Sequence, residues 1–202
     1  MYFQKPEKFV SPYVLEIGSY TTRAGYAGCD LPTKIHRTET LSIGTPDGEQ
    51  FYSYNPIFLN SNVDLENARV VRPIQGNSIP DWDVMEEYLD YILSGSRIEL
   101  SDTPLLLVEP PVHIRENRIK FVEMLFEKLD SCGVSFAKSS LMSAYLSSRE
   151  NALVVDIGAY NTYVTPVHEG FIMNKAMMMY NFGGTHFFSK TKNQLSSRGS
   201  TH

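Results

Sequence analysis

The sequence predicts an α/β fold with a mixed sheet flanked by helices, and two observations lead to this prediction. A strand-turn-strand pattern, with an acidic residue and a glycine at the turn, occurs twice: residues 14–22 read VLEIGSYTT and residues 154–162 read VVDIGAYNT. Between the two copies, short apolar runs alternate with amphipathic stretches. Such alternation favours parallel strands joined by helices, and the two hairpins add antiparallel pairs.

The first copy is expected to form an antiparallel hairpin. Residues 13–17 are typical of a buried strand, residues 22–27 form the returning strand, and Gly28 closes it. The following stretch, residues 41–62, is polar, aromatic and rich in turn residues. We therefore expect a mobile hairpin or loop there.

Helices and strands alternate in the middle of the chain. Ser78, Pro80 and Asp81 are typical of a helix start, and apolar residues then recur at helical spacing as far as Gly95. The elements predicted next are a strand at residues 104–108, a helix with the apolar stripe Ile119, Val122, Leu125, Phe126 and Leu129, a strand at 134–137, a helix at 139–148 and the second hairpin at 152–167.

The last part of the chain shows less pattern. The methionine run at residues 177–179 predicts a core or interface strand. After Gly183 and Gly184 the apolar periodicity ends, and residues 189–202 are polar. We expect a disordered tail there.

Composition excludes several classes of function. The net charge of −5 offers no basic surface for nucleic acid, so direct sequence-specific contact with DNA or RNA is not expected. Cys29 and Cys132 are too few for a disulfide framework and have no metal-ligand spacing, which favours a reducing compartment. No run of about 18 apolar residues occurs, so we expect a soluble intracellular protein without membrane contact.

The duplicated turn suits phosphate binding. Backbone N–H groups of a glycine-containing turn can surround an anion, while the carboxylate before the glycine holds a cation directly or through water. A single motif of this kind would be weak support, because glycine is common in turns. The duplication with matching flanks is stronger. Two such hairpins facing each other would clamp a phosphate between two related domains.

These motifs resemble the actin family, within the larger group that clamps ATP between two related domains. Outside the hairpins, the resemblance is carried by RAGYAG at residues 23–28, DWDVME at 81–86, residues 105–126 with EPP at 109–111 and RENR at 115–118, and PVHEG at 166–170. It extends from about residue 13 to residue 184, nearly the whole chain.

The resemblance implies an actin-like ATPase fold that is incomplete. The expected divisions are a first domain at residues 12–148 with an insertion near 33–70, the start of a second domain at 149–188 and a tail at 189–202. Family members are longer, and their remaining half supplies most adenine and ribose contacts and completes the core of the first domain. The resemblance therefore implies a truncated chain with exposed apolar surface, marginal stability and poor ATP affinity.

By the same resemblance, the β- and γ-phosphates lie at the two turns, and the ligand is ATP with Mg²⁺ or Ca²⁺. Glu16 and Asp156 correspond to the acidic residues near the metal, which they would hold through water. The implied cofactor-binding residues are Gly18, Ser19, Tyr20, Arg23, Asp156, Gly158, Ala159, Tyr160, Gly183 and Gly184. The alternative is that both turns kept their shape after losing the nucleotide.

Several positions depart from conventional actin in ways that disfavour hydrolysis. Tyr20 and Tyr160 place rings where the backbone should approach phosphate closely. Ala159 lacks a carboxylate, and Arg23 replaces a compact ammonium with a planar guanidinium. Lys138 stands where actins place the glutamine that orients water, and a charged ammonium cannot accept a proton; an ordinary solvated lysine is the alternative there. We expect weak or absent ATP hydrolysis and assign no catalytic residue.

The form GSYTTRAGY at residues 18–26 is similar to the nuclear actin-related proteins. These pair with actin on a helical segment of a scaffold subunit in chromatin remodelling and histone acetyltransferase complexes. The resemblance thus implies a non-catalytic structural subunit in the nucleus. Two alternatives stay open: a cytoskeletal actin-related protein of filaments, branching or motor adaptors in the cytoplasm, and a phosphotransferase of the sugar-kinase type.

Overall fold

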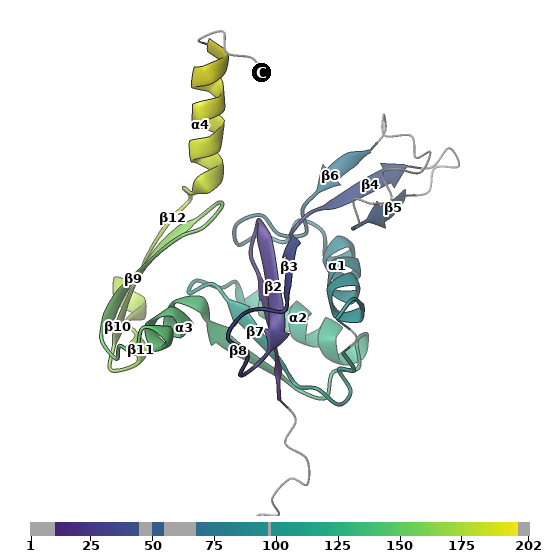
Figure 1. Cartoon of the computed structure of the whole chain (residues 1–202), viewed down its shortest axis with the longest axis horizontal. Coiled ribbons are helices and arrows are strands. Elements are labelled where there is room, and N and C mark those ends of the chain that lie inside the picture. The colour runs from purple at the N-terminus through teal and green to yellow at the C-terminus, as the bar shows by residue number, and fades with distance from the viewer. Residues whose placement is uncertain (1–10, 45–49, 55–67, 97, 198–202) are drawn as a thin grey trace, which may run out of the picture.

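A computed structural model of the chain describes residues 11–44, 50–54, 68–96 and 98–197 (Figure 1). The described residues form three sheets and four α-helices. The first sheet has the order β3-β2-β1-β7-β8. Its strands are β1 (Tyr13–Ile17), β2 (Thr21–Tyr26), β3 (Lys34–Arg37), β7 (Leu105–Glu109) and β8 (Val134–Lys138). Strands β1, β7 and β8 run parallel, whereas β1, β2 and β3 pair antiparallel, which confirms the predicted mixed sheet.

Two helices pack on this sheet and form the core. Helix α1 (Trp82–Ser94) begins at Asp81, whose carboxylate accepts hydrogen bonds from the N–H groups of its first turn, as a helix start requires. Helix α2 is Arg115–Glu127. The largest core side chains come from β1, β7 and the two helices and include Tyr13, Leu15, Met85, Leu89, Ile92, Leu105 and Leu125.

A second sheet contains the second predicted hairpin, β9 (Ala152–Ile157) and β10 (Thr162–His168), with β11 (Phe171–Ile172) and β12 (Met178–Tyr180) paired to the other edge of β10. A 3₁₀ turn at Asn174–Ala176 precedes β12. Helix α3 (Ser139–Leu146) lies between the two sheets (Figure 1). The Ser140 hydroxyl donates a buried hydrogen bond of 3.1 Å to the Thr165 hydroxyl on β10, which joins α3 to the second sheet.

The third sheet is small and has the order β5-β4-β6. Its strands are β4 (Thr40–Gly44), β5 (Gln50–Ser53) and β6 (Arg69–Val71). Strands β4 and β5 form the hairpin predicted within residues 41–62, although residues 45–49 and 55–67 lie outside the described part. Tyr54, which directly follows β5, stacks on Tyr91 of α1 with ring centroids 4.8 Å apart, and this contact holds the end of the β4–β5 hairpin against α1.

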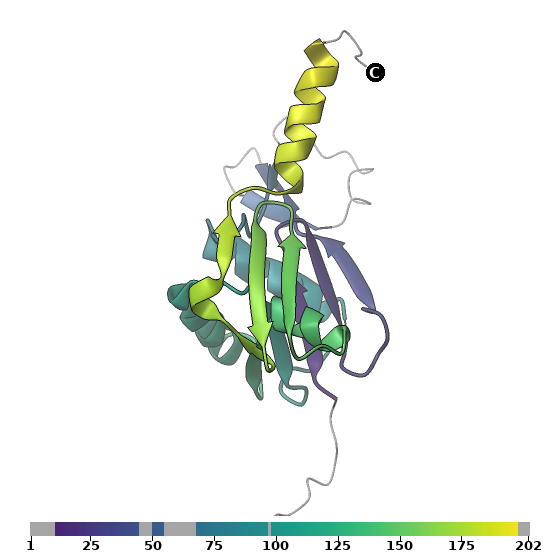
Figure 2. The same cartoon turned by 90° about the vertical axis from the view of Figure 1, so that its left-hand side faces the viewer.

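Three expectations need correction. Residues 189–197, predicted as disordered, belong to helix α4 (Gly184–Ser197), which projects away from the sheets (Figures 1 and 2). None of the side chains of α4 is buried, so its sequence lacks the periodic apolar pattern by which a helix packed on a core can be predicted. The methionine run enters β12 as a strand, but Met178 is 54% exposed, so the core alternative is wrong and the interface alternative stays a prediction. Within α2 only Met124 and Leu125 are buried, so most of the predicted stripe lies nearer the surface.

None of the described helices combines the length and the apolar character that a bilayer-spanning segment needs.

Candidate functional site

The two predicted turns share one backbone geometry. In each hairpin the strand residue before the glycine pairs with the residue four positions after that glycine. The Gly18 N–H donates to the Thr21 carbonyl at 3.1 Å, and the Gly158 N–H donates to the Asn161 carbonyl at 2.9 Å. A Cβ atom added to Gly18 would lie 2.8 Å from the Thr21 carbonyl oxygen, and one added to Gly158 would lie 3.1 Å from the Asn161 carbonyl oxygen. The close approach therefore explains glycine at both positions.

Each turn presents two backbone N–H groups without a protein acceptor in the described part of the chain. They belong to Ser19 and Tyr20 in the first turn and to Ala159 and Tyr160 in the second. Successive N–H groups of this kind form concave sites for anions. The donors that the phosphate prediction requires are present in both copies.

A short turn at residues 75–78 contacts both hairpins. The Gly76 N–H donates to the Ser19 hydroxyl at 2.9 Å, and the Asn161 side chain donates to the Asn77 side-chain oxygen at 3.4 Å. Gly76 has a φ of +63°, and a Cβ atom there would lie 3.1 Å from the Asn161 amide. The two hairpin turns are thus bridged by one short element.

Gly183 and Gly184 lie against the second turn. The Gly184 N–H donates to the Gly158 carbonyl at 2.9 Å, and the Thr185 N–H donates to the Ala159 carbonyl at 2.9 Å. A Cβ atom on Gly183 would lie 2.5 Å from the Gly158 carbonyl oxygen, so only glycine fits without a shift. The structure therefore brings together four of the predicted binding residues, Gly158, Ala159, Gly183 and Gly184. Their role in nucleotide binding stays a prediction.

The acidic residues predicted to hold a metal have different surroundings. Glu16 lies directly opposite Arg23 on β2, and the two form an ion pair of 3.1 Å. Asp156 lies opposite Tyr163 on β10. The described residues contain no cluster of three or more His, Cys, Asp or Glu side chains suited to a metal ion. The Glu16 carboxylate, already paired with a guanidinium, does not fit the hard-oxygen site that a divalent cation needs.

Tyr20, in the first turn, has an unpredicted neighbour. The guanidinium carbon of Arg37 lies 3.7 Å from the centre of the Tyr20 ring, and the Thr38 N–H donates to the Tyr20 carbonyl at 3.1 Å. Both contacts come from the end of β3. Sequence reasoning missed Arg37, because only the pairing of β2 with β3 places it beside the turn.

A charged cluster lies at the carboxyl ends of β7 and β8. The Lys138 ammonium is 2.8 Å from the Glu109 carboxylate and 2.6 Å from Nδ1 of His113, and it donates to the Pro110 carbonyl at 3.3 Å. Arg118 forms a second ion pair with Glu109. Lys138 is therefore a paired, partly buried group, which contradicts the alternative of an ordinary solvated lysine.

Burial and charge shift the pKa values in this cluster. Burial alone would raise the pKa of Glu109, but the hydrogen bonds from Arg118 and Lys138 outweigh it and hold the pKa below its ordinary value. Burial lowers the pKa of Lys138, against the opposing effect of Glu109. Burial and then the Lys138 charge lower the pKa of His113. A neutral His113 ring can accept a hydrogen bond from the ammonium.

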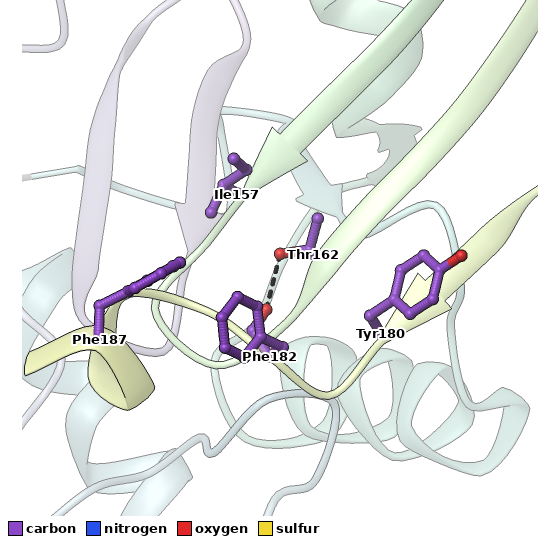
Figure 3. Close-up of a pocket in the computed structure, with 5 residues that line it drawn as sticks. All are labelled: Ile157, Thr162, Tyr180, Phe182 and Phe187. Atoms are coloured by element: carbon purple, nitrogen blue, oxygen red, sulfur yellow. Dashed lines mark hydrogen bonds between the residues drawn. The ribbon is translucent and has the colours of Figure 1, made fainter. Parts of the chain in front are cut away.

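An apolar hollow of about 270 Å³ lies beside the second turn, where α4 begins (Figure 3). It is lined by Ile157, Thr162, Tyr180, Phe182 and Phe187. The Thr162 hydroxyl donates to the Phe182 carbonyl at 2.6 Å, which uses its one donor. None of these residues was predicted for the site, and the aromatic lining does not suit a phosphate group.

A family model described as Actin matches residues 7–201. The chain belongs to the actin family. The match confirms the predicted family and the actin-like fold. It also extends through α4, so the predicted end of the similarity near Gly184 is wrong.

Several curated proteins are similar to this member of the actin family. Actin-related protein 4 of Yarrowia lipolytica is 30% identical over 200 residues, which cover 94% of this chain and 46% of the relative. Actin-related protein 4 of Arabidopsis thaliana is 27% identical over 94% of this chain and 49% of the relative. Actin-like protein 9 of Bos taurus is 31% identical over 86% of this chain and 42% of the relative. The chain thus spans about half the length of these relatives.

Proposed function

We propose that this actin-related chain binds the phosphates of ATP between its two hairpin turns and serves as a non-catalytic structural subunit in the nucleus. The observation that supports the nucleotide part is the pair of matching turns. Each has two backbone N–H groups without an acceptor among the described residues, and both contact residues 75–78. Such donors complement a polyphosphate at little reorganisation cost, because the glycine geometry already fixes the turns.

The proposal of little hydrolysis is supported by the groups around the turns. A water molecule that attacks phosphate needs a group that orients it or accepts its proton. Lys138 is engaged by Glu109, by the Pro110 carbonyl and by His113, and its ammonium has no free lone pair. Tyr20, half exposed in the first turn, adds bulk where phosphate approaches.

The proposed setting is a complex with actin on a helical segment of a chromatin remodelling or histone acetyltransferase scaffold. Two features support it: the GSYTTRAGY form of the first turn, and the similarity to proteins named actin-related protein 4 in a yeast and a plant. A structural subunit needs the nucleotide as a ligand that stabilises its domain pair, and it does not need turnover.

The ATP part is tested by calorimetric titration of the 202-residue chain with ATP, together with a phosphate-release assay. We expect binding without release above the buffer rate. Ser19→Ala removes the hydroxyl that joins the first turn to Gly76 and should weaken binding about threefold to tenfold, the range for one hydrogen bond. Ser143→Ala, on the exposed side of α3, is the matched control and should bind as the parent chain does. Absence of binding, or release at the rate of conventional actin, would refute this part.

The partner part is tested separately by purifying the tagged chain from nuclei and identifying the bound proteins. Actin together with remodeller or acetyltransferase subunits is the expected result. Recovery of filament, branching or motor-adaptor components in their place would favour a cytoskeletal role.

A further inference from the structure

We infer that this chain binds the triphosphate without a divalent cation, with the guanidinium groups of Arg23 and Arg37 supplying the positive charge at the first turn. The inference rests on the proposed ATP binding and concerns the charge balance of that same site. It departs from the metal-assisted binding that the family resemblance implies.

The first step concerns Glu16, the carboxylate that would approach a metal ion. Its oxygen Oε2 lies 3.1 Å from Nη1 of Arg23, directly across the hairpin. A cation on that oxygen would have to displace the guanidinium or remain beside it, and like charges at such distances repel. A divalent ion also needs several hard oxygen ligands. The Glu16 carboxylate therefore already has a positively charged partner, the guanidinium of Arg23.

The second step concerns the position of Arg37. Its guanidinium stacks on Tyr20, 3.7 Å from the ring centre, and this places a fixed positive charge beside the unpaired N–H groups of the turn. The stacked guanidinium is planar and forked, and such groups bind phosphate oxygens in pairs. Within the described residues, only its Nε is engaged, by Glu39 at 3.3 Å, so both terminal amino groups remain for a ligand.

The third step concerns the charges that oppose Arg37. Glu39 accepts from Arg37 and, at 3.1 Å, from Arg72, so one carboxylate is shared between two arginines. Together with the Glu16–Arg23 pair, three guanidinium groups face two carboxylates near the turn. At the first turn this leaves an excess of one positive charge, which supplies part of the neutralisation that a metal ion gives in other nucleotide sites; Asp156 belongs to the second turn and lies outside this set.

Calorimetric titration of the full chain with ATP tests the inference in two buffers, one with Mg²⁺ and one with EDTA. We expect dissociation constants that agree within about threefold, a difference below one tenfold step in affinity. Binding that is more than tenfold weaker in EDTA would overturn the inference and leave the proposed ATP binding intact. Absence of binding in both buffers would instead refute the proposed function, and the inference with it.

Variants identify the groups responsible. Arg37→Gln should weaken binding in EDTA about tenfold, as expected for loss of a charge-assisted contact, and Arg37→Lys should recover part of the loss. Arg149→Gln, at an exposed arginine beyond α3, is the matched control and should change nothing. Unchanged binding by Arg37→Gln would overturn the assignment. Melting curves of all variants establish that each one folds.

The Glu16→Gln variant distinguishes most sharply between a carboxylate that only pairs with Arg23 and one that holds a metal ion. If Arg23 alone uses this carboxylate, its neutralisation frees a guanidinium and should strengthen ATP binding in both buffers. If Glu16 holds a metal ion, the same change should weaken binding in Mg²⁺ only, and that result would contradict the inference.

Discussion

Gly18 and Gly158 occupy equivalent positions, but the first leaves less room for a side chain. A Cβ atom would lie 2.8 Å from a backbone oxygen at residue 18 and 3.1 Å at residue 158. We predict that Gly18→Ala lowers the free energy of unfolding by about 1–3 kcal/mol, because the backbone must shift, and that Gly158→Ala costs less than about 1 kcal/mol.

Denaturant unfolding measures both changes. Gly133→Ala is the matched control, since its Cβ atom would come no closer than 3.9 Å to Pro104. Equal costs at Gly18 and Gly158, or a cost at Gly133 as large as either, would contradict the steric explanation.

The charged cluster at Glu109 predicts a loss of stability in acid. Its folded-state pKa lies below the ordinary 4.5, so its contribution is complete above that pH and is lost as the pH falls through the folded value. The folded-state pKa of His113 lies below 6.5, so the unfolded chain takes up the proton first and stability also falls below that pH.

The measurement is the free energy of unfolding from pH 7.5 down to pH 3.5. We expect a decline that begins near pH 6.5 and steepens below pH 4.5. The His113→Ala variant should lose part of the first decline and keep the second, because burial and then the Lys34 charge also lower the pKa of His36, which keeps its own share of the first part. A stability that rises on acidification would show that these groups are not placed as described.

At the level of secondary structure, α4 depends on the second turn. The N–H groups of Gly184 and Thr185 donate to the carbonyls of Gly158 and Ala159, and Gly183 allows this approach. We predict that Gly183→Ala separates α4 from the turn and increases amide exchange at residues 184 and 185 about tenfold, the effect of losing one hydrogen bond. Gly133→Ala again serves as the control. Unchanged exchange in Gly183→Ala would mean that α4 is held by other contacts.

The elements with a buried face could be predicted from the sequence. Strands β1, β7 and β10 and helix α1 alternate or repeat apolar residues because one face lies in the core. Strand β3 and helix α4 could not be predicted, since neither contains a buried residue and burial is what produces a pattern. The Asp81 helix start was recognisable because its chemistry is local.

In the candidate site, too, the local features could be predicted from the sequence and the tertiary contacts could not. Both turns followed from the repeated residues alone. The contact of Arg37 with Tyr20 and the bridge through residues 75–78 depend on tertiary arrangement, which no local pattern records. The pairing of Lys138 with Glu109 could have been suspected, because each residue directly follows a predicted strand, yet it requires β7 and β8 to be adjacent.

At the scale of the whole molecule, the described residues include an exposed apolar sheet face, as expected from the family resemblance. Leu153, Val155 and Ile157 point to one side of β9 and are 65%, 55% and 63% exposed. Their counterparts on β1 in the repeated hairpin are Tyr13, Leu15 and Ile17, which belong to the core with α1 and α2. The marginal stability expected from this exposed surface stays a prediction.

Amide exchange at residues 18–20 and 158–160, followed during a titration with ATP, tests most directly whether the two turns form one phosphate clamp. We predict that both turns become protected together, with the same midpoint, because one ligand contacts both. Protection of a single turn, or of neither at saturating ATP, would contradict the clamp.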